Sequence, residues 1–125
     1  MRVLVDSCGW VAYLTDGPLA EKFAPLLKRI HDVVVPTVVQ YEVYKWVCRE
    51  REETLALRVV GHMEQGVVRP LDTRVALLAA DISRERGLSM ADAIVYAHAR
   101  LEDVKLVTSD KHFEGLPGVI LHGVR

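Results

Sequence analysis

Val3-Leu4-Val5-Asp6-Ser7, near the start of the chain, indicates a short strand that ends at an acid. Three consecutive apolar residues, two of them β-branched, are typical of a strand buried on both faces. The same pattern recurs at Val33-Val34-Val35-Pro36 and Lys105-Leu106-Val107-Thr108. Strands of this kind are typical of parallel sheets, because helices cover both faces of such a sheet. The sequence therefore predicts an α/β domain.

Segments with helical spacing of apolar residues separate these strands. Pro25 predicts a kink or a break in one of them, and Thr37 is the predicted N-cap of another. The predicted helices are 9–14, 19–30, 37–51, 53–64, 72–87 and 89–102, and two further short strands are 67–71 and 119–121. This order predicts one three-layer α/β/α domain over residues 1–125, with a mainly parallel sheet of about five strands.

The composition excludes several classes of protein. Hydrophobic residues make up 50% of the 125 residues and charged residues 26%, which excludes a disordered chain. Sixteen Lys and Arg residues stand against seventeen Asp and Glu residues, for a net charge of −1. This balance excludes a nucleic-acid binder that works through a basic tail, but it leaves room for a local basic groove. We find no dinucleotide-binding or Walker motif after any strand.

The start of the chain and the two cysteines predict a cytoplasmic protein. Asp6 interrupts the first apolar run, so that run is no signal peptide, and no stretch approaches the length of a membrane span. Cys8 and Cys48 lack a second cysteine or a histidine at metal-ligand spacing. We expect them to be small buried apolar side chains in a reducing compartment, with a disulfide between them as the alternative.

Four acids stand out by their positions. Asp6 and Asp110 follow predicted strands, where the sites of parallel α/β sheets lie. Glu42 is isolated among uncharged residues of its helix, which indicates that it faces a partner or a cleft. Asp92 lies in the first turn of its helix. Each has an ordinary alternative: a cap or turn for Asp6 and Asp110, a solvated side chain for Glu42, and a capping-box residue for Asp92.

Short segments around these acids follow one another along the chain: Val5-Asp6-Ser7, Val39-Gln40-Tyr41-Glu42-Val43, Met90-Ala91-Asp92-Ala93-Ile94-Val95 and Leu106-Val107-Thr108-Ser109-Asp110. Each alone is a weak motif. Together and in this order they resemble the motifs of PIN-domain ribonucleases, and among these the toxins of VapBC-type toxin–antitoxin pairs. The resemblance covers essentially the whole chain.

The resemblance implies one acidic pocket, made by Asp6, Glu42, Asp92 and Asp110, that binds Mg²⁺ or Mn²⁺. It also implies that Ser7 and Thr108 line the site, while Lys111 and His112 are candidates to touch substrate. Hard oxygen ligands favour these two ions over Zn²⁺. The implied reaction is metal-dependent hydrolysis of RNA, with water as the nucleophile and with 5′-phosphate and 3′-hydroxyl ends.

An RNA substrate requires cations and aromatic side chains near the acids. The candidate cations are Lys45, Arg49, Arg84, Arg86, Arg100 and Lys111, and the candidate stacking residues are Tyr13, Tyr41, Tyr44 and Trp46. For Trp46, as for Trp10, a place in the core or at an interface is the favoured alternative. The resemblance further implies a homodimer and a small antitoxin. Tyr41, Tyr44, Val47 and the helix 53–63 are candidate contact residues for these partners.

Three other functions stay open at this point. The first alternative function is that of a Mg²⁺-dependent phosphatase or a flap nuclease. The second is that of a nuclease in RNA processing without a toxin role. In the third, the chain is a non-enzymatic α/β binding module whose acids are caps.

Overall fold

Five parallel strands form one sheet in the computed structural model, which describes residues 1–123. They are β1 (Val3–Val5), β2 (Val33–Pro36), β3 (Val67–Arg69), β4 (Lys105–Thr108) and β5 (Val119–Leu121), in the order β3-β2-β1-β4-β5. The predicted α/β/α fold with a parallel sheet of about five strands is confirmed. Residues 124 and 125 of the predicted domain lie outside the described residues.

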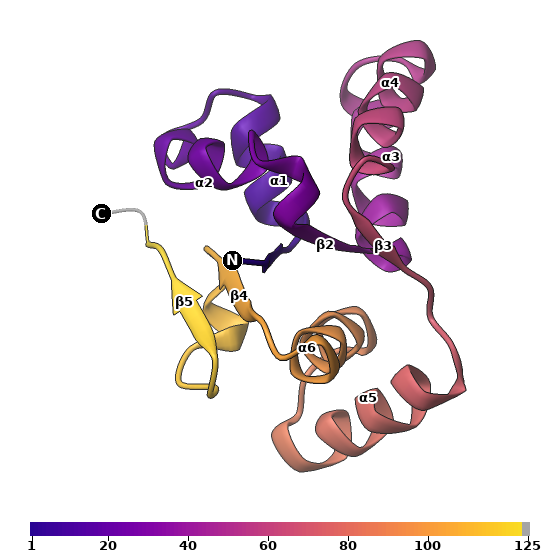
Figure 1. Cartoon of the computed structure of the whole chain (residues 1–125), viewed down its shortest axis with the longest axis vertical. Coiled ribbons are helices and arrows are strands. Elements are labelled where there is room, and N and C mark those ends of the chain that lie inside the picture. Colours follow the sequence, from indigo (N-terminus) through magenta and orange to yellow (C-terminus); the bar gives the residue numbers. More distant parts are fainter. Residues whose placement is uncertain (124–125) are drawn as a thin grey trace.

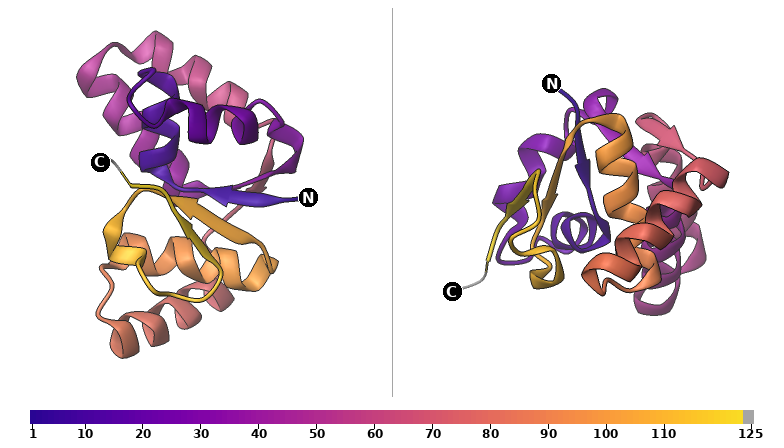
Figure 2. Two further views of the ribbon diagram at one scale, coloured as in Figure 1. Left: turned by 90° about the vertical axis from the view of Figure 1, so that its left-hand side faces the viewer. Right: turned by 90° about the horizontal axis from the view of Figure 1, so that it is seen from below.

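Helices cover both faces of the sheet (Figures 1 and 2). One face carries α1 (Ser7–Leu14), α2 (Ala20–Leu27), α3 (Thr37–Glu50) and α4 (Glu53–Met63), and the other carries α5 (Thr73–Arg86) and α6 (Met90–Glu102). Right-handed crossovers explain this division. The chain moves outward from β1 to β2 to β3, and then returns across the sheet to β4, so its last helix pair covers the opposite face.

The core lies on both sides of the central strands. Leu4, Val34 and Leu106 have no exposed surface, and they belong to neighbouring strands. Trp10 of α1 and Phe23 of α2 are fully buried on the face of the sheet that these two helices cover (Figure 2). None of the helices within residues 1–123 is long and apolar enough to span a membrane.

Three local predictions need correction. Thr37 is the first residue of α3, and Pro36 holds the N-cap position without a side-chain hydrogen bond, so the predicted Thr37 cap is wrong. The helix α2 continues past Pro25, so the predicted break there is wrong, while a kink stays a prediction; the helix ends at Leu27 and not at Ile30. The third strand ends at Arg69, because Pro70 lacks the N–H that would continue the ladder.

Other local signals predict the helix ends correctly. Asp72 caps α5, since its Oδ1 accepts a hydrogen bond from the Val75 N–H at 3.0 Å. Gly87 ends that helix in the left-handed region, with φ 74°. Ser89 caps α6 through its hydroxyl, which accepts from the Asp92 N–H at 3.4 Å.

Gly9 allows α1 to pack closely against β1 and α2. A methyl group at this position would overlap Val5 Cγ1 and lie only 2.7 Å from Cδ1 of Phe23. Both neighbours are fully buried in the core. Gly61 of α4 offers a contrast, because no atom in the described part of the chain lies within 4 Å of its added methyl group.

We expect Gly9→Ala to lower the free energy of unfolding by about 1–3 kcal/mol, the range for overpacking of a filled core. Gly61→Ala is the matched control, and it should raise the free energy of unfolding by up to about 1 kcal/mol, since alanine favours a helix over glycine. Urea denaturation followed by circular dichroism measures both. Equal stability of Gly9→Ala and wild type would contradict the packing described here.

Candidate functional site

The four predicted acids meet at the edge of the sheet where the strands end. Asp6 directly follows β1, and Asp110 lies two residues beyond β4, which pairs with β1. The strand order reverses between these two strands, and such a switch point is where parallel sheets place their sites. Glu42 reaches this edge from α3 and Asp92 from α6. The charges of Asp6, Asp92 and Asp110 all raise the pKa of Glu42.

Asp6 is the most deeply placed of the four, with 5% of its surface exposed. Its Oδ2 accepts a hydrogen bond from the Thr108 hydroxyl at 2.7 Å, and its Oδ1 accepts one from the Cys8 thiol at 2.9 Å. The Gly9 N–H also points to Oδ1, at 3.4 Å, so Asp6 is the N-cap of α1 as well. Burial raises the pKa of Asp6, these hydrogen bonds oppose the rise, and the charge of Asp110 adds to it.

Thr108 connects the two acids that follow strands. Its hydroxyl donates to Asp6 and accepts a hydrogen bond from the Asp110 N–H at 2.9 Å. Asp110 Oδ1 in turn accepts from the His112 N–H at 2.9 Å, which makes Asp110 the cap of the short 3₁₀ helix Lys111–Phe113. Thr108 therefore lies beside the acids, as the resemblance implies.

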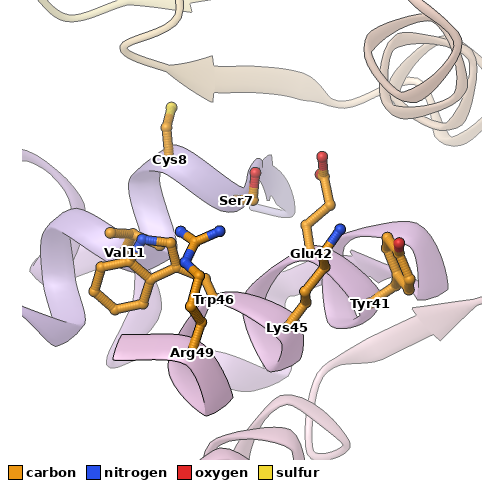
Figure 3. A pocket seen from close by; sticks show the side chains of 8 residues that line it. All are labelled: Ser7, Cys8, Val11, Tyr41, Glu42, Lys45, Trp46 and Arg49. Carbon is orange, nitrogen blue, oxygen red and sulfur yellow. The ribbon is translucent and has the colours of Figure 1, made fainter. Parts of the chain in front are cut away.

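Glu42 faces the site and is half-buried. Burial raises its pKa, and the neighbouring carboxylates add to the rise. Ser7 lies beside Glu42 across the space between α1 and α3 (Figure 3), and its hydroxyl lowers the pKa of Glu42. The isolation of Glu42 along its helix thus indicates a cleft, as expected, rather than a solvated face.

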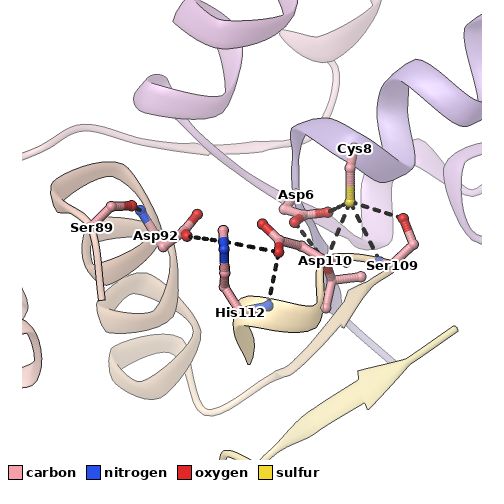
Figure 4. A network of polar contacts seen from close by, with 8 residues as sticks. Asp6, Cys8, Ser89, Asp92, Ser109, Asp110 and His112 are labelled. Carbon is pink, nitrogen blue, oxygen red and sulfur yellow. Dashed lines mark hydrogen bonds and ion pairs between the residues drawn. The ribbon is translucent and has the colours of Figure 1, made fainter. Parts of the chain in front are cut away.

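Asp92 and Asp110 share a neighbour, His112 (Figure 4). Its Nδ1 lies 3.4 Å from Asp92 Oδ2 and 3.2 Å from Asp110 Oδ1. Burial raises the pKa of Asp92, and so does the charge of Asp110, whereas Ser89 and His112 lower it. The sequence identified His112 only as a candidate for substrate contact. Its spacing from Asp110, two residues, is the signal that places it between the acids.

Cys8 is the residue that sequence reasoning missed. Its Sγ donates to Asp6, and it accepts from the Ser109 N–H at 3.4 Å and from the Ser109 hydroxyl at 3.2 Å. Burial and the Asp6 charge raise the pKa of Cys8 to about 11, so the thiol is neutral at pH 7. Cys8 therefore joins the site network instead of being only an apolar side chain. Both cysteines are free, and the alternative of a disulfide is wrong.

Two cavities flank the acids. The larger, of about 440 Å³, lies between α1 and α3 and includes Glu42 in its wall. Its other lining side chains are Ser7, Cys8, Val11, Tyr41, Lys45, Trp46 and Arg49 (Figure 3). The second, of about 300 Å³, includes Asp92, His112 and Arg86. The site thus opens on both sides of the carboxylates.

The predicted cations divide into two groups. Lys45 and Arg49 line the larger cavity and Arg86 the smaller one. Lys111 is exposed next to Asp110 in the chain. Two others are not at the site. Arg84 pairs with Asp81 at 3.1 Å, and Arg100 lies about 12 Å along α6 from Asp92, at 1.5 Å per residue.

The donor set fits a hard divalent cation. Four carboxylates converge, and the carboxyls of Asp6, Glu42 and Asp92 have raised pKa values because burial and their neighbours' charges disfavour ionisation. Oxygen atoms of Asp92 and Asp110 lie within 4.8 Å of each other and of a His112 ring nitrogen. A bound cation would relieve this repulsion, and Mg²⁺ and Mn²⁺ are the ions that prefer carboxylate oxygens.

The fold recurs in solved toxin–antitoxin structures. A toxin–antitoxin complex from Klebsiella pneumoniae matches with a TM-score of 0.82 at 21% identity, over 98% of this chain and 100% of that chain. DNA-bound VapBC from Salmonella typhimurium matches at 0.74 and 19%, over 98% of both chains. VapC20 from Mycobacterium tuberculosis, described as a toxin that cleaves the sarcin-ricin loop, matches at 0.76 and 16%, over 94% of this chain and 97% of that chain. At these identities the likeness shows the fold.

A family model gives the assignment that structural likeness alone does not. No curated protein matches the chain. The model of the PIN domain matches residues 3–119, which span β1 to β4, the first residue of β5 and the four acids. The chain therefore belongs to the PIN-domain family.

Proposed function

We propose that this chain is a Mg²⁺- or Mn²⁺-dependent endoribonuclease and the toxin of a toxin–antitoxin pair. The observation that carries the proposal is the convergence of four carboxylates, each from a different element, at the switch point of the sheet. A cluster of helix caps would not require Glu42, which caps nothing and yet faces the other three acids.

The chain's own residues have distinct parts in this proposal. Asp6, Glu42, Asp92 and Asp110 hold the cation, which when bound supplies activation of water and neutralises charge on the phosphoryl oxygens. Thr108 and Cys8 fix both oxygens of Asp6, so that carboxylate keeps one orientation. Ser7 steadies Glu42. Lys45, Arg49 and Arg86 attract the RNA backbone on either side of the acids, and the exposed Lys111 is a further candidate for substrate contact.

The toxin role and the partners rest on likeness. Chains of solved toxin–antitoxin complexes have this fold over nearly the whole chain. A further solved structure with this fold, VapC20, is described as a toxin that cleaves the sarcin-ricin loop. We propose an antitoxin and a second copy of this chain as partners. Leu55 and Leu57 of α4 are exposed and suit such a contact. Val47 is 2% exposed and part of the core, so its expected place on that surface is wrong.

Asp6→Asn and Asp92→Asn each test the assignment of the site. We expect either change to reduce RNA cleavage in Mg²⁺ by at least roughly a hundredfold, more than the 10- to 100-fold typical of a residue that only supports a metal ligand. Thr108→Val should fall within that lower range, because it removes the donor to Asp6. Rates on a single-stranded RNA measure all three.

Asp81→Asn is the control, because Asp81 is an exposed acid whose one ion pair among the described residues is with Arg84. It should cleave at the wild-type rate. Mapping of RNA ends after induction in cells then tests the reaction and the toxin role together. We expect growth arrest and 5′-phosphate ends, both lost in Asp6→Asn. Ends with 2′,3′-cyclic phosphate would contradict the reaction, and cleavage without arrest would favour a nuclease of RNA processing.

The raised carboxyl pKa values predict how pH and metal affect stability. The folded, metal-free protein retains protons on Asp6, Glu42 and Asp92 that the unfolded chain releases above about pH 4. The cluster's contribution to stability is therefore full at lower pH and is lost as pH rises through the raised values. Because Mg²⁺ binds the deprotonated groups, the increase in melting temperature on adding Mg²⁺ should grow with pH.

Asp6→Asn separates repulsion from metal binding in the same measurement. We expect the metal-free variant to melt at a higher temperature than wild type at pH 7, because one buried charge is gone, and to lose most of the shift with Mg²⁺. Asp81→Asn should behave as wild type in both respects. A lower melting temperature for metal-free Asp6→Asn would contradict the repulsion among the acids.

A further inference from the structure

We propose that the cavity between α1 and α3 binds an unpaired RNA base, stacked on Trp46, next to the cleaved phosphate. This inference rests on the proposed ribonuclease function and names a part of its substrate. The cavity, of about 440 Å³, shares Glu42 with the acid cluster, so it begins where the reaction would take place. A base bound in this cavity would therefore be next, along the RNA strand, to the phosphate held at the acids.

The cavity follows one side of α3. Glu42, Trp46 and Arg49 have the spacing i, i+4 and i+7, which places them in a row along one helix face. The row extends about 10 Å from Glu42 to Arg49, at 1.5 Å per residue. Figure 3 shows Glu42, Lys45 and Arg49 extending from α3 on the side that faces α1. The acid that would hold the cation and the cations that would hold a neighbouring phosphate thus lie along one line.

The wall of the cavity suits a flat aromatic ligand. Trp46 is half-buried, and Val11 of α1 provides an apolar surface in the same wall. Tyr41 is 61% exposed at the rim. Tyr41 and Trp46 are the aromatic residues in the wall of this cavity. Trp46 also packs against the core, as Tyr13 and Tyr44 do, so its ring is held in place at the wall. Every base has a π-face, and stacking on such side chains is the usual way of binding unpaired bases.

The charges of the cavity favour a polyanion over a peptide. Lys45 and Arg49 are both exposed in it, and Lys45 Nζ lies 5.7 Å above the Tyr41 ring. Within residues 1–123, Arg49 bonds only to the adjacent Glu50, at 3.1 Å with 62% of its side chain exposed, so its guanidinium remains available. An RNA strand supplies a phosphate for these cations and a base for Trp46 at once. A protein segment would need acidic and aromatic side chains in the same short stretch.

Steady-state cleavage of a single-stranded RNA pool with randomised sequence tests the inference. We expect Trp46→Leu to raise KM about 5- to 100-fold with little change in kcat, the effect of losing one stacked base. Trp46→Phe should retain most of the affinity, because it keeps a ring. Sequencing of the products should show that Trp46→Leu flattens the base preference at one position beside the cut. Melting curves of both variants establish that they fold.

Arg49→Gln tests the neighbouring phosphate. It should raise KM and reduce the slope of log KM against log salt by about 0.7, the value for one contact to a single strand. Arg58→Gln is the matched control, since Arg58 is an exposed arginine of α4 and is not part of the cavity wall. It should leave both quantities as in wild type.

The outcomes separate the two proposals. Absence of RNA cleavage by wild type with Mg²⁺ or Mn²⁺ would overturn the proposed function. Normal cleavage by wild type, with KM and base preference unchanged in folded Trp46→Leu, would overturn the base site alone. The base site would also be overturned if Trp46→Leu cleaved RNA normally and lost binding of an antitoxin, because the cavity would then hold a protein segment.

Discussion

The hydroxyl of Thr108 is the point on which the geometry of the site depends. It donates to Asp6 at 2.7 Å and accepts from the Asp110 N–H at 2.9 Å. The parallel register of Val5 with Val107 brings the two strand ends level, so that residue 108 meets residue 6. Cys8 adds a second connection from Asp6 to Ser109. Because side chains hold the ends of β1 and β4 together, two carboxylates that repel each other are kept at one edge of the sheet.

Interactions with helix ends compensate for part of the repulsion between the carboxylates. Asp6 caps α1, Asp110 caps a 3₁₀ turn, and Asp92 lies in the first turn of α6. Backbone N–H groups at these ends carry partial positive charge, which favours an acid there. Setting aside the four acids leaves thirteen Asp and Glu residues against sixteen Lys and Arg residues in the rest of the chain. The net charge of −1 therefore conceals an acidic pocket within a mildly basic domain.

The sequence predicts much of this arrangement because its strands are short and apolar and its helix caps are local. Asp6 and Asp110 are predictable together, since parallel strands end at one edge. The contacts of Cys8 are not predictable, because Ser109 is 101 residues away in the chain. The spacing of apolar residues along a helix also has a limit as a predictor. It does not distinguish Val47, which is in the core, from Trp46 beside it, which lines a cavity. Arg100 is expected near the acids because it is on the same helix as Asp92, but it lies at the far end of that helix.

The interpretation of these acids as caps and their interpretation as a site are compatible. A cap needs one carboxylate oxygen, and Asp6 and Asp110 each give one oxygen, Oδ1, to a backbone N–H. Burial raises the pKa of Asp6 and of Asp92, and the charge of Asp110 adds to both rises. Glu42 has no capping role and reaches the same place from the middle of the chain. Stable helix ends would explain three of these acids and leave Glu42 unexplained, whereas the proposed cation accounts for all four.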